Sequence, residues 1–188
     1  MKKQTKKLTL AEIKHELAEV ARIGQMFVDG DLCRQAWQPY AEKFMCGDDM
    51  DYNPATTVPL KKTLFRLERL GRIPCCTTLW RRRADFPDSG EALLFGSLSS
   101  PIGGNKPAAR GYQPPKMTPE MKEVFLKGRS AWCMDPKSPA IRLQAGRGIK
   151  VLAKGLKKST TVQLFVPVKD SMGEIAAALE VHTMAIVE

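Results

Sequence analysis

The residues best suited to specific chemistry are arginines that stand beside a tryptophan. Trp80 is followed by Arg81, Arg82 and Arg83 in a run typical of a β-strand. Because strand side chains alternate, Trp80 and Arg82 share one face. A guanidinium binds a carboxylate through two parallel hydrogen bonds, so Trp80 and Arg82 are candidate contacts for an anionic ligand. The competing interpretation is a solvated edge strand that its charge protects from pairing.

Three other residues complete the candidate ligand contacts. Arg142 follows Trp132 and Cys133 in the sequence and is either a second anion contact or simply exposed. His182 is either a hydrogen-bond donor to a ligand or a histidine on a surface strand. Phe165 belongs to the C-terminal hairpin considered below.

The motifs of common enzymes are missing from the sequence. GSLSS is not a Gly-x-Ser-x-Gly elbow, and the Gly-x-Gly in GRGIKVLAKGLKK fits neither nucleotide-binding spacing. His15 and His182 have no companions at ligand spacing, so we expect no metal site and no cofactor. We therefore expect a protein that is not an enzyme. Five cysteines without a Cys-x-x-Cys favour free thiols over a disulfide framework.

Positive charge is concentrated after residue 56. The net charge is +10, with eight basic residues against Glu68 alone in 61–83 and six with no acid in 142–158. Such a field attracts anions, from small carboxylates to nucleic acid. A nucleic-acid-binding protein that uses these two clusters is therefore the alternative function. No recognised nucleic-acid motif accompanies the clusters.

The length of 188 residues suits one domain, with or without an N-terminal appendage. No run approaches the roughly 20 apolar residues of a membrane helix. The basic start leads into a charged segment and not into an apolar signal core. We expect a cytoplasmic protein, or an extracytoplasmic one if the sequence is an excised piece of a longer chain.

The chain divides into a helix within residues 1–30 and a domain over 31–188. Thr9 and Glu12 have the spacing of a capping box. The heptad-like apolar stripe that follows spans less than three heptads. Packing on its own domain is therefore the first interpretation of this helix, and a homodimer through it is the second.

Later segments read as a mixture of helices and strands, separated near residues 100–117 by a Pro- and Gly-rich loop that is a lid, a binding loop or disordered. Helices are predicted at 31–45 with a break at Pro39, at 58–70 from a Thr57 cap, and at 118–127, and strands at 75–86, 91–98, 140–144, 149–155, 161–169 and 174–184.

The C-terminal stretch FVPVKDSMGEIAAALEV predicts a hairpin. A four-residue turn over 170–173, closed by Gly173 with a positive φ, places Lys169 opposite Glu174 and Val166 opposite Ala177. One face of the hairpin is then wholly apolar and is expected to pack on helices. The other face is exposed, covered by the 100–117 loop, or the floor of a small pocket, and it carries Gln163, Phe165, Pro167, Ala176, Ala178, Glu180 and His182.

This hairpin resembles the last two strands of the Cache and PAS-like sensor domains. The shared features are an apolar strand that ends in Pro-Val, a charged turn with Asp and Gly, and a return strand of small residues. The resemblance implies an α+β fold with an antiparallel sheet of five or six strands, a long N-terminal helix and helices packed on one face. It also implies a small-molecule pocket on a face of the sheet.

The leading hypothesis is thus a sensory, ligand-binding domain for a small anionic metabolite. The binding residues are expected to be Trp80, Arg82, Arg142, Phe165 and His182.

Overall fold

The predicted capping box starts the N-terminal helix. In the computed structural model, which describes residues 7–36, 54–82, 90–95, 117–134 and 150–187, helix α1 spans Leu10–Phe27. The Thr9 hydroxyl accepts a hydrogen bond from the Glu12 N–H (3.2 Å), and the Glu12 carboxylate accepts one from the Thr9 N–H (2.7 Å). Two N–H groups that the helix itself leaves unpaired are thereby satisfied.

Three more helices and six strands follow in the described residues. They are α2 (Gly30–Gln35), α3 (Pro54–Leu70), β1 (Cys76–Arg82), β2 (Gly90–Phe95), α4 (Pro119–Lys127), β3 (Ala131–Cys133), β4 (Lys150–Leu152), β5 (Thr160–Lys169) and β6 (Ile175–Ile186).

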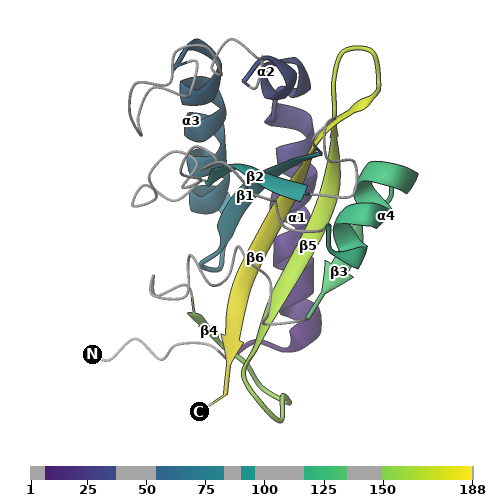
Figure 1. Cartoon of the computed structure of the whole chain (residues 1–188). Coiled ribbons are helices and arrows are strands. Elements are labelled where there is room, and N and C mark those ends of the chain that lie inside the picture. Colours follow the sequence, from purple (N-terminus) through teal and green to yellow (C-terminus); the bar gives the residue numbers. More distant parts are fainter. Residues whose placement is uncertain (1–6, 37–53, 83–89, 96–116, 135–149, 188) are drawn as a thin grey trace, which may run out of the picture.

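The strands form one sheet in which β6 is central (Figure 1). Five strands pair antiparallel in the order β2-β1-β6-β5-β3. Strand β4 pairs with β6 in parallel, beyond the residues of β6 that pair with β1. The α+β class and the expected number of strands are confirmed.

Helices cover both faces of the sheet. The apolar stripe of α1 is buried with α2, α3 and one set of alternating strand residues, including Leu79, Val166 and Leu179. Helix α4 packs on the opposite face against Trp80, Phe165 and Ala178. The expectation that the helices lie on one face therefore holds for α1, α2 and α3 only. Helix α4 lies beside β3, the edge strand next to β5 (Figure 1).

The C-terminal hairpin forms, but the predicted pairing of its strands is wrong, by one residue at Lys169 and by two residues farther from the turn. Lys169 lies opposite Ile175 and Val166 lies opposite Leu179, with an irregularity between Val168 and Lys169. The turn is longer than predicted, because Asp170 and Glu174 close it through a backbone hydrogen bond of 2.9 Å. For residues 162–168 of β5 and 177–182 of β6 a shift of two residues leaves the side chains on their predicted faces. Beside the irregularity the prediction is wrong, because Ile175 faces Gly128 at the end of α4 and Ala176 packs with the core on the α1 side. Gly173 has the expected positive φ, at 80°.

Pro167 sits where β5 lacks a strand neighbour on one side. Strand β3 pairs only with residues 163–165 of β5, so within the described residues Pro167 lies beyond its end. A missing N–H donor leaves no gap in a ladder there. The Pro167 carbonyl accepts a hydrogen bond from Gln25 Nε2 of α1 (2.9 Å), which ties this helix to the hairpin.

Several predicted boundaries need correction. Helix α3 begins at Pro54 and not at the Thr57 cap, which leaves Pro59 inside the helix. Strand β3 was not predicted, since three residues carry too little pattern to recognise. The predicted strand at 140–144, the break at Pro39 and residues 100–116 of the predicted loop lie outside the described residues, and Met117 at the end of that loop is buried beside Trp80 and Phe165. Among the described helices, none is long and apolar enough to cross a membrane.

Candidate functional site

The sheet face opposite α1 carries a group of buried polar side chains at its centre. We call it the Glu180 cluster, and it comprises Thr78, Trp80, Gln163, Glu180 and His182, none more than 4% exposed. These residues come from the three neighbouring strands β1, β6 and β5. Side-chain alternation, together with the pairing of Thr78 to Glu180 and of Gln163 to His182, places all five on one face.

Glu180 is the centre of the hydrogen bonding. Its Oε2 accepts from the indole Nε1 of Trp80 at 2.6 Å, and its Oε1 accepts from Nε2 of Gln163 at 2.7 Å. Burying a carboxylate is costly unless hydrogen-bond donors replace the lost water. Two donors from two different strands therefore stabilise a group that is 0% exposed.

His182 lies beside the same carboxylate. Its Nδ1 is 2.9 Å from Glu180 Oε1, which is within ion-pair distance, but the two atoms do not have hydrogen-bond geometry. A protonated His182 would offset the negative charge of Glu180 inside the protein. In the sheet His182 lies opposite Gln163 on one side and Cys76 on the other.

Three buried polar atoms of the Glu180 cluster lack a hydrogen-bond partner. They are Thr78 Oγ1, Gln163 Oε1 and His182 Nδ1. Most buried polar atoms in native proteins are paired, so such atoms indicate a site for an ordered water or a ligand. Because Gln163 Oε1 can only accept, the missing partner must offer it a hydrogen-bond donor.

An apolar wall adjoins the cluster. Phe165 and Trp80 pack with Met121 and Val124 of α4. This helix begins at a Thr118 cap and ends at Gly128, which has a φ of 65°. The Glu180 cluster thus lies next to a buried apolar layer that α4 and the sheet form together.

Three of the five residues predicted from the sequence meet here. Trp80 and His182 belong to the Glu180 cluster, and Phe165 belongs to the adjoining wall. Arg82 lies two residues beyond Trp80 at the exposed end of β1, so alternation puts it on the same face. Arg142 lies outside the described residues.

Sequence reasoning missed the residue at the centre of the site. Glu180 was placed on the correct face but was not selected, because a glutamate on a strand is usually solvated. Its central role depends on Trp80, which is 100 residues away in sequence. The available signal was a row of polar residues, Gln163, Glu180 and His182, within the otherwise apolar stretches 162–168 and 175–182.

The Glu180 cluster offers both hydrogen-bond donors and hydrogen-bond acceptors around one carboxylate. Within the described residues, no three His, Cys, Asp or Glu side chains converge so that they could hold a metal ion. Cys33 and Cys75 lie in the core on the α1 side, where burial first and nearby carboxylates second raise the pKa of each thiol to about 12. These two thiols are thus separated from the site.

Comparison with known proteins adds no relative. No model of a known protein family matches the chain, and no curated protein resembles it significantly.

Proposed function

We propose that this chain is a non-enzymatic, sensory ligand-binding domain of the Cache/PAS-like kind, with the Glu180 cluster as its binding site. The observation that carries the proposal is the set of three unpaired buried atoms, Thr78 Oγ1, Gln163 Oε1 and His182 Nδ1. Further support comes from the α+β fold and from the gathering of Trp80, Phe165 and His182 on one face. A small ligand would satisfy the unpaired atoms and pack on the α4 wall.

The proposed ligand is a small metabolite with an anionic end and a hydrogen-bond-donating end. Two carboxylates close together repel each other, so the anionic end belongs away from Glu180. Arg82, at the exposed end of the same face, is suited to bind it. The donating end would then reach Gln163 Oε1 at the buried centre.

A route from the site to the N-terminal helix supports the sensory part of the proposal. Helix α1 packs on β5 and β6, the two strands that carry Gln163 and Glu180. It is also hydrogen-bonded to the Pro167 carbonyl through Gln25. A ligand shifts α1 only if it binds two arrangements of this helix on the sheet with different affinity.

Thermal unfolding across a panel of amino acids, small carboxylates, purines and phosphates tests the proposal. A ligand at 100 times its dissociation constant stabilises the folded state by about 2.7 kcal/mol, which raises the unfolding midpoint. We expect one compound class to raise it, and we expect Gln163→Leu and Arg82→Ala each to reduce the shift. Gln25→Leu, on the opposite side of the sheet, is the matched control and should keep it.

The same measurements can also contradict the proposal. If no compound shifts the midpoint and Gln163→Leu raises the stability of the free protein, Gln163 Oε1 is only a buried polar atom without a function. The site would then be abandoned.

Nucleic-acid binding is the second candidate function, and exposed basic residues on α3 favour it. Lys62, Arg66 and Arg69 are all exposed along this helix. Phosphate contacts of this kind lose affinity steeply as salt rises. Binding of a labelled oligonucleotide at 50 and 200 mM salt, with Lys62→Glu and Arg66→Glu as variants, separates this function from the first.

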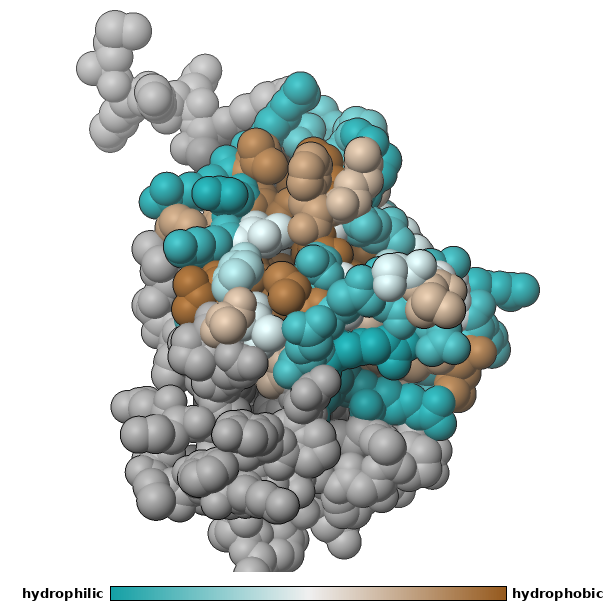
Figure 2. Space-filling view, turned by 90° about the horizontal axis from the view of Figure 1, so that it is seen from above, coloured by the Kyte–Doolittle hydropathy of each residue, from teal (hydrophilic) through white to brown (hydrophobic). Residues whose placement is uncertain are grey.

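A homodimer through the N-terminal helix has little apolar surface left to use. The stripe of α1, including Ile13, Leu17 and Val20, is buried in its own domain. Only the end of the helix exposes large apolar side chains, with Met26 69% and Phe27 66% exposed. Seen from that end, Figure 2 shows apolar side chains at the surface among polar ones. Sedimentation of the Phe27→Glu variant against the parent protein tests this contact.

A further inference from the structure

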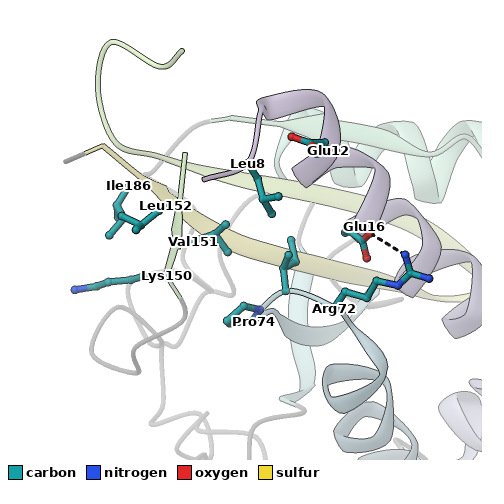
Figure 3. Close-up of a pocket in the computed structure, with 10 residues that line it drawn as sticks. Leu8, Glu12, Glu16, Arg72, Pro74, Lys150, Val151, Leu152 and Ile186 are labelled. Carbon is teal, nitrogen blue, oxygen red and sulfur yellow. Dashed lines mark ion pairs between the residues drawn. The ribbon is translucent and has the colours of Figure 1, made fainter. Parts of the chain in front are cut away.

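A cavity of about 460 Å³ lies on the α1 side of the sheet (Figure 3), on the face opposite to that of the Glu180 cluster. It arises from the sheet topology. Strand β1 pairs with β6 up to His182, and β4 continues along β6 from Met184. The first turns of α1 cover this junction between two strands, and the lining residues are Leu8, Glu12, Glu16, Arg72, Ile73, Pro74, Lys150, Val151, Leu152 and Ile186.

The walls of the cavity are mainly apolar. Leu8 and Val151 come from two separate segments and face the same space, while Ile186 lies beside Leu152 on the other side of β4 (Figure 3). The segment of Leu8 is fixed by backbone hydrogen bonds to Leu152 and Lys154, each 2.9 Å. The volume of the cavity lies in the range of small-molecule sites, roughly 300–1,000 Å³. Apolar walls hold water poorly, so a ligand with an apolar body would gain by filling the space.

One charged group is available to a ligand inside this cavity. The Glu16 side chain is only 19% exposed, and its ion pair with Arg72 is long, at 3.9 Å. The Arg72 side chain is 85% exposed, so water screens its charge much more strongly. Glu12 is held by its capping box, and Lys150 extends away from the cavity (Figure 3).

We propose that this cavity binds an organic cation with an apolar body, such as an alkylammonium. The ammonium group pairs with Glu16 and displaces the weakly held Arg72, and the alkyl chain packs on Leu8 and Val151. The site is separate from the Glu180 cluster, so the two proposals stand or fall independently.

The test uses n-hexylammonium, n-hexanoate and n-hexanol as probes of equal length. Binding is followed by methyl NMR of the full chain, with Leu8 and Val151 as reporters and Val124 of α4, on the other face of the sheet, as a remote control. We expect hexylammonium to shift the two reporters saturably and to bind more tightly than hexanol or hexanoate.

Substitutions then test whether the Glu16 carboxylate binds the ammonium group. Glu16→Gln should weaken hexylammonium binding about three- to fivefold and leave hexanol unchanged, as expected for a partly exposed ion pair. Glu19→Gln is the matched control on the same helix, since its carboxylate pairs with Arg22 at the surface. Arg72→Ala should strengthen hexylammonium binding by freeing Glu16.

The proposal is overturned if no probe shifts the reporters, or if all three probes bind equally in the parent protein and in Glu16→Gln. Tighter binding of hexanoate that depends on Arg72 would also overturn it, because the cavity would then select an anion.

Discussion

The indole N–H of Trp80 donates to the carboxylate of Glu180 across two neighbouring strands, over 2.6 Å, with both side chains no more than 2% exposed. In the ladder the two residues are diagonal neighbours, since Trp80 lies opposite Ala178 and Glu180 lies opposite Thr78. The large ring packs on α4 while its polar edge reaches the buried acid. One side chain therefore joins the apolar wall to the polar cluster.

Replacing Trp80 with Phe should expose the cost of this arrangement. The ring volume is partly kept, but Glu180 Oε2 loses its donor. A buried charged acceptor left unpaired costs about 1–3 kcal/mol or more in the free energy of unfolding, measured in urea. Trp132→Phe is the matched control, because Trp132 is 37% exposed and its ring faces Lys14. Equal losses in both variants would show that the hydrogen bond to Glu180 contributes nothing.

Asp170 should make stability fall in acid. Desolvation alone would raise the pKa of this carboxyl. Hydrogen bonds from the Glu174 and Met172 backbone N–H groups and from Arg34 lower the pKa, and their combined effect is the larger. The pKa of Asp170 is therefore below its ordinary value of 3.8. A lowered folded-state pKa means that the stabilisation is fully present above the unfolded pKa. It is then lost as the pH falls through the folded pKa.

The measurement is the urea midpoint of the parent protein and of Asp170→Asn from pH 6 to pH 2. The parent should be the more stable at pH 6, and the difference should shrink below about pH 4. Glu174→Gln is the control, because the Glu174 side chain is 73% exposed. A constant difference across the whole range would contradict the assignment to Asp170.

Gly30 should tolerate no side chain. A Cβ there would lie 2.2 Å from the Lys169 carbonyl oxygen and 2.7 Å from the Asp170 nitrogen, both backbone atoms. Gly30→Ala must therefore push α2 away from the hairpin, and overpacking of this kind costs about 1–3 kcal/mol or more. At Gly24 a Cβ would meet Leu179 Cδ2 at 2.3 Å, but a side chain can move. Calorimetry should thus show the larger fall in melting temperature for Gly30→Ala than for Gly24→Ala.

Cys33 and Cys75 should resist thiol reagents in the folded protein. Burial, with a smaller contribution from Asp29 and Glu68 respectively, raises the pKa of each thiol to about 12. Almost no thiolate is then present at pH 8, and the thiolate is the reactive form. Mass spectrometry after brief iodoacetamide treatment should find these two cysteines unlabelled until urea is added. Rapid labelling of either in the native state would refute their burial.

The sequence predicted those features that depend on local chemistry. The cap at Thr9, the end of α4 at Gly128 and the hairpin turn with Gly173 are all present. Each depends on a residue whose backbone or side chain has one strong preference. The two faces of the hairpin were also correct away from the turn, since alternation has a fixed period of two, but Ile175 and Ala176 lie on the faces opposite to those predicted.

The features that failed depend on distant residues. The register was set by an irregularity beside Lys169, and nothing in the local pattern marks it. The packing of α4 on the face opposite α1 depends on contacts between residues far apart in sequence, and so does the pairing of Trp80 with Glu180. For the same reason the cavity beside Glu16 had no sequence signal, because its lining comes from four separate segments.

The central position of β6 also constrains how the protein is made. This strand follows all the others in sequence, yet it pairs with β1, β4 and β5. During synthesis β1 waits for about 95 residues before its partner at 175–186 leaves the ribosome. Until then its unpaired edge is open to other chains. We therefore expect the nascent chain to be prone to wrong pairing at β1 until residues 175–186 emerge.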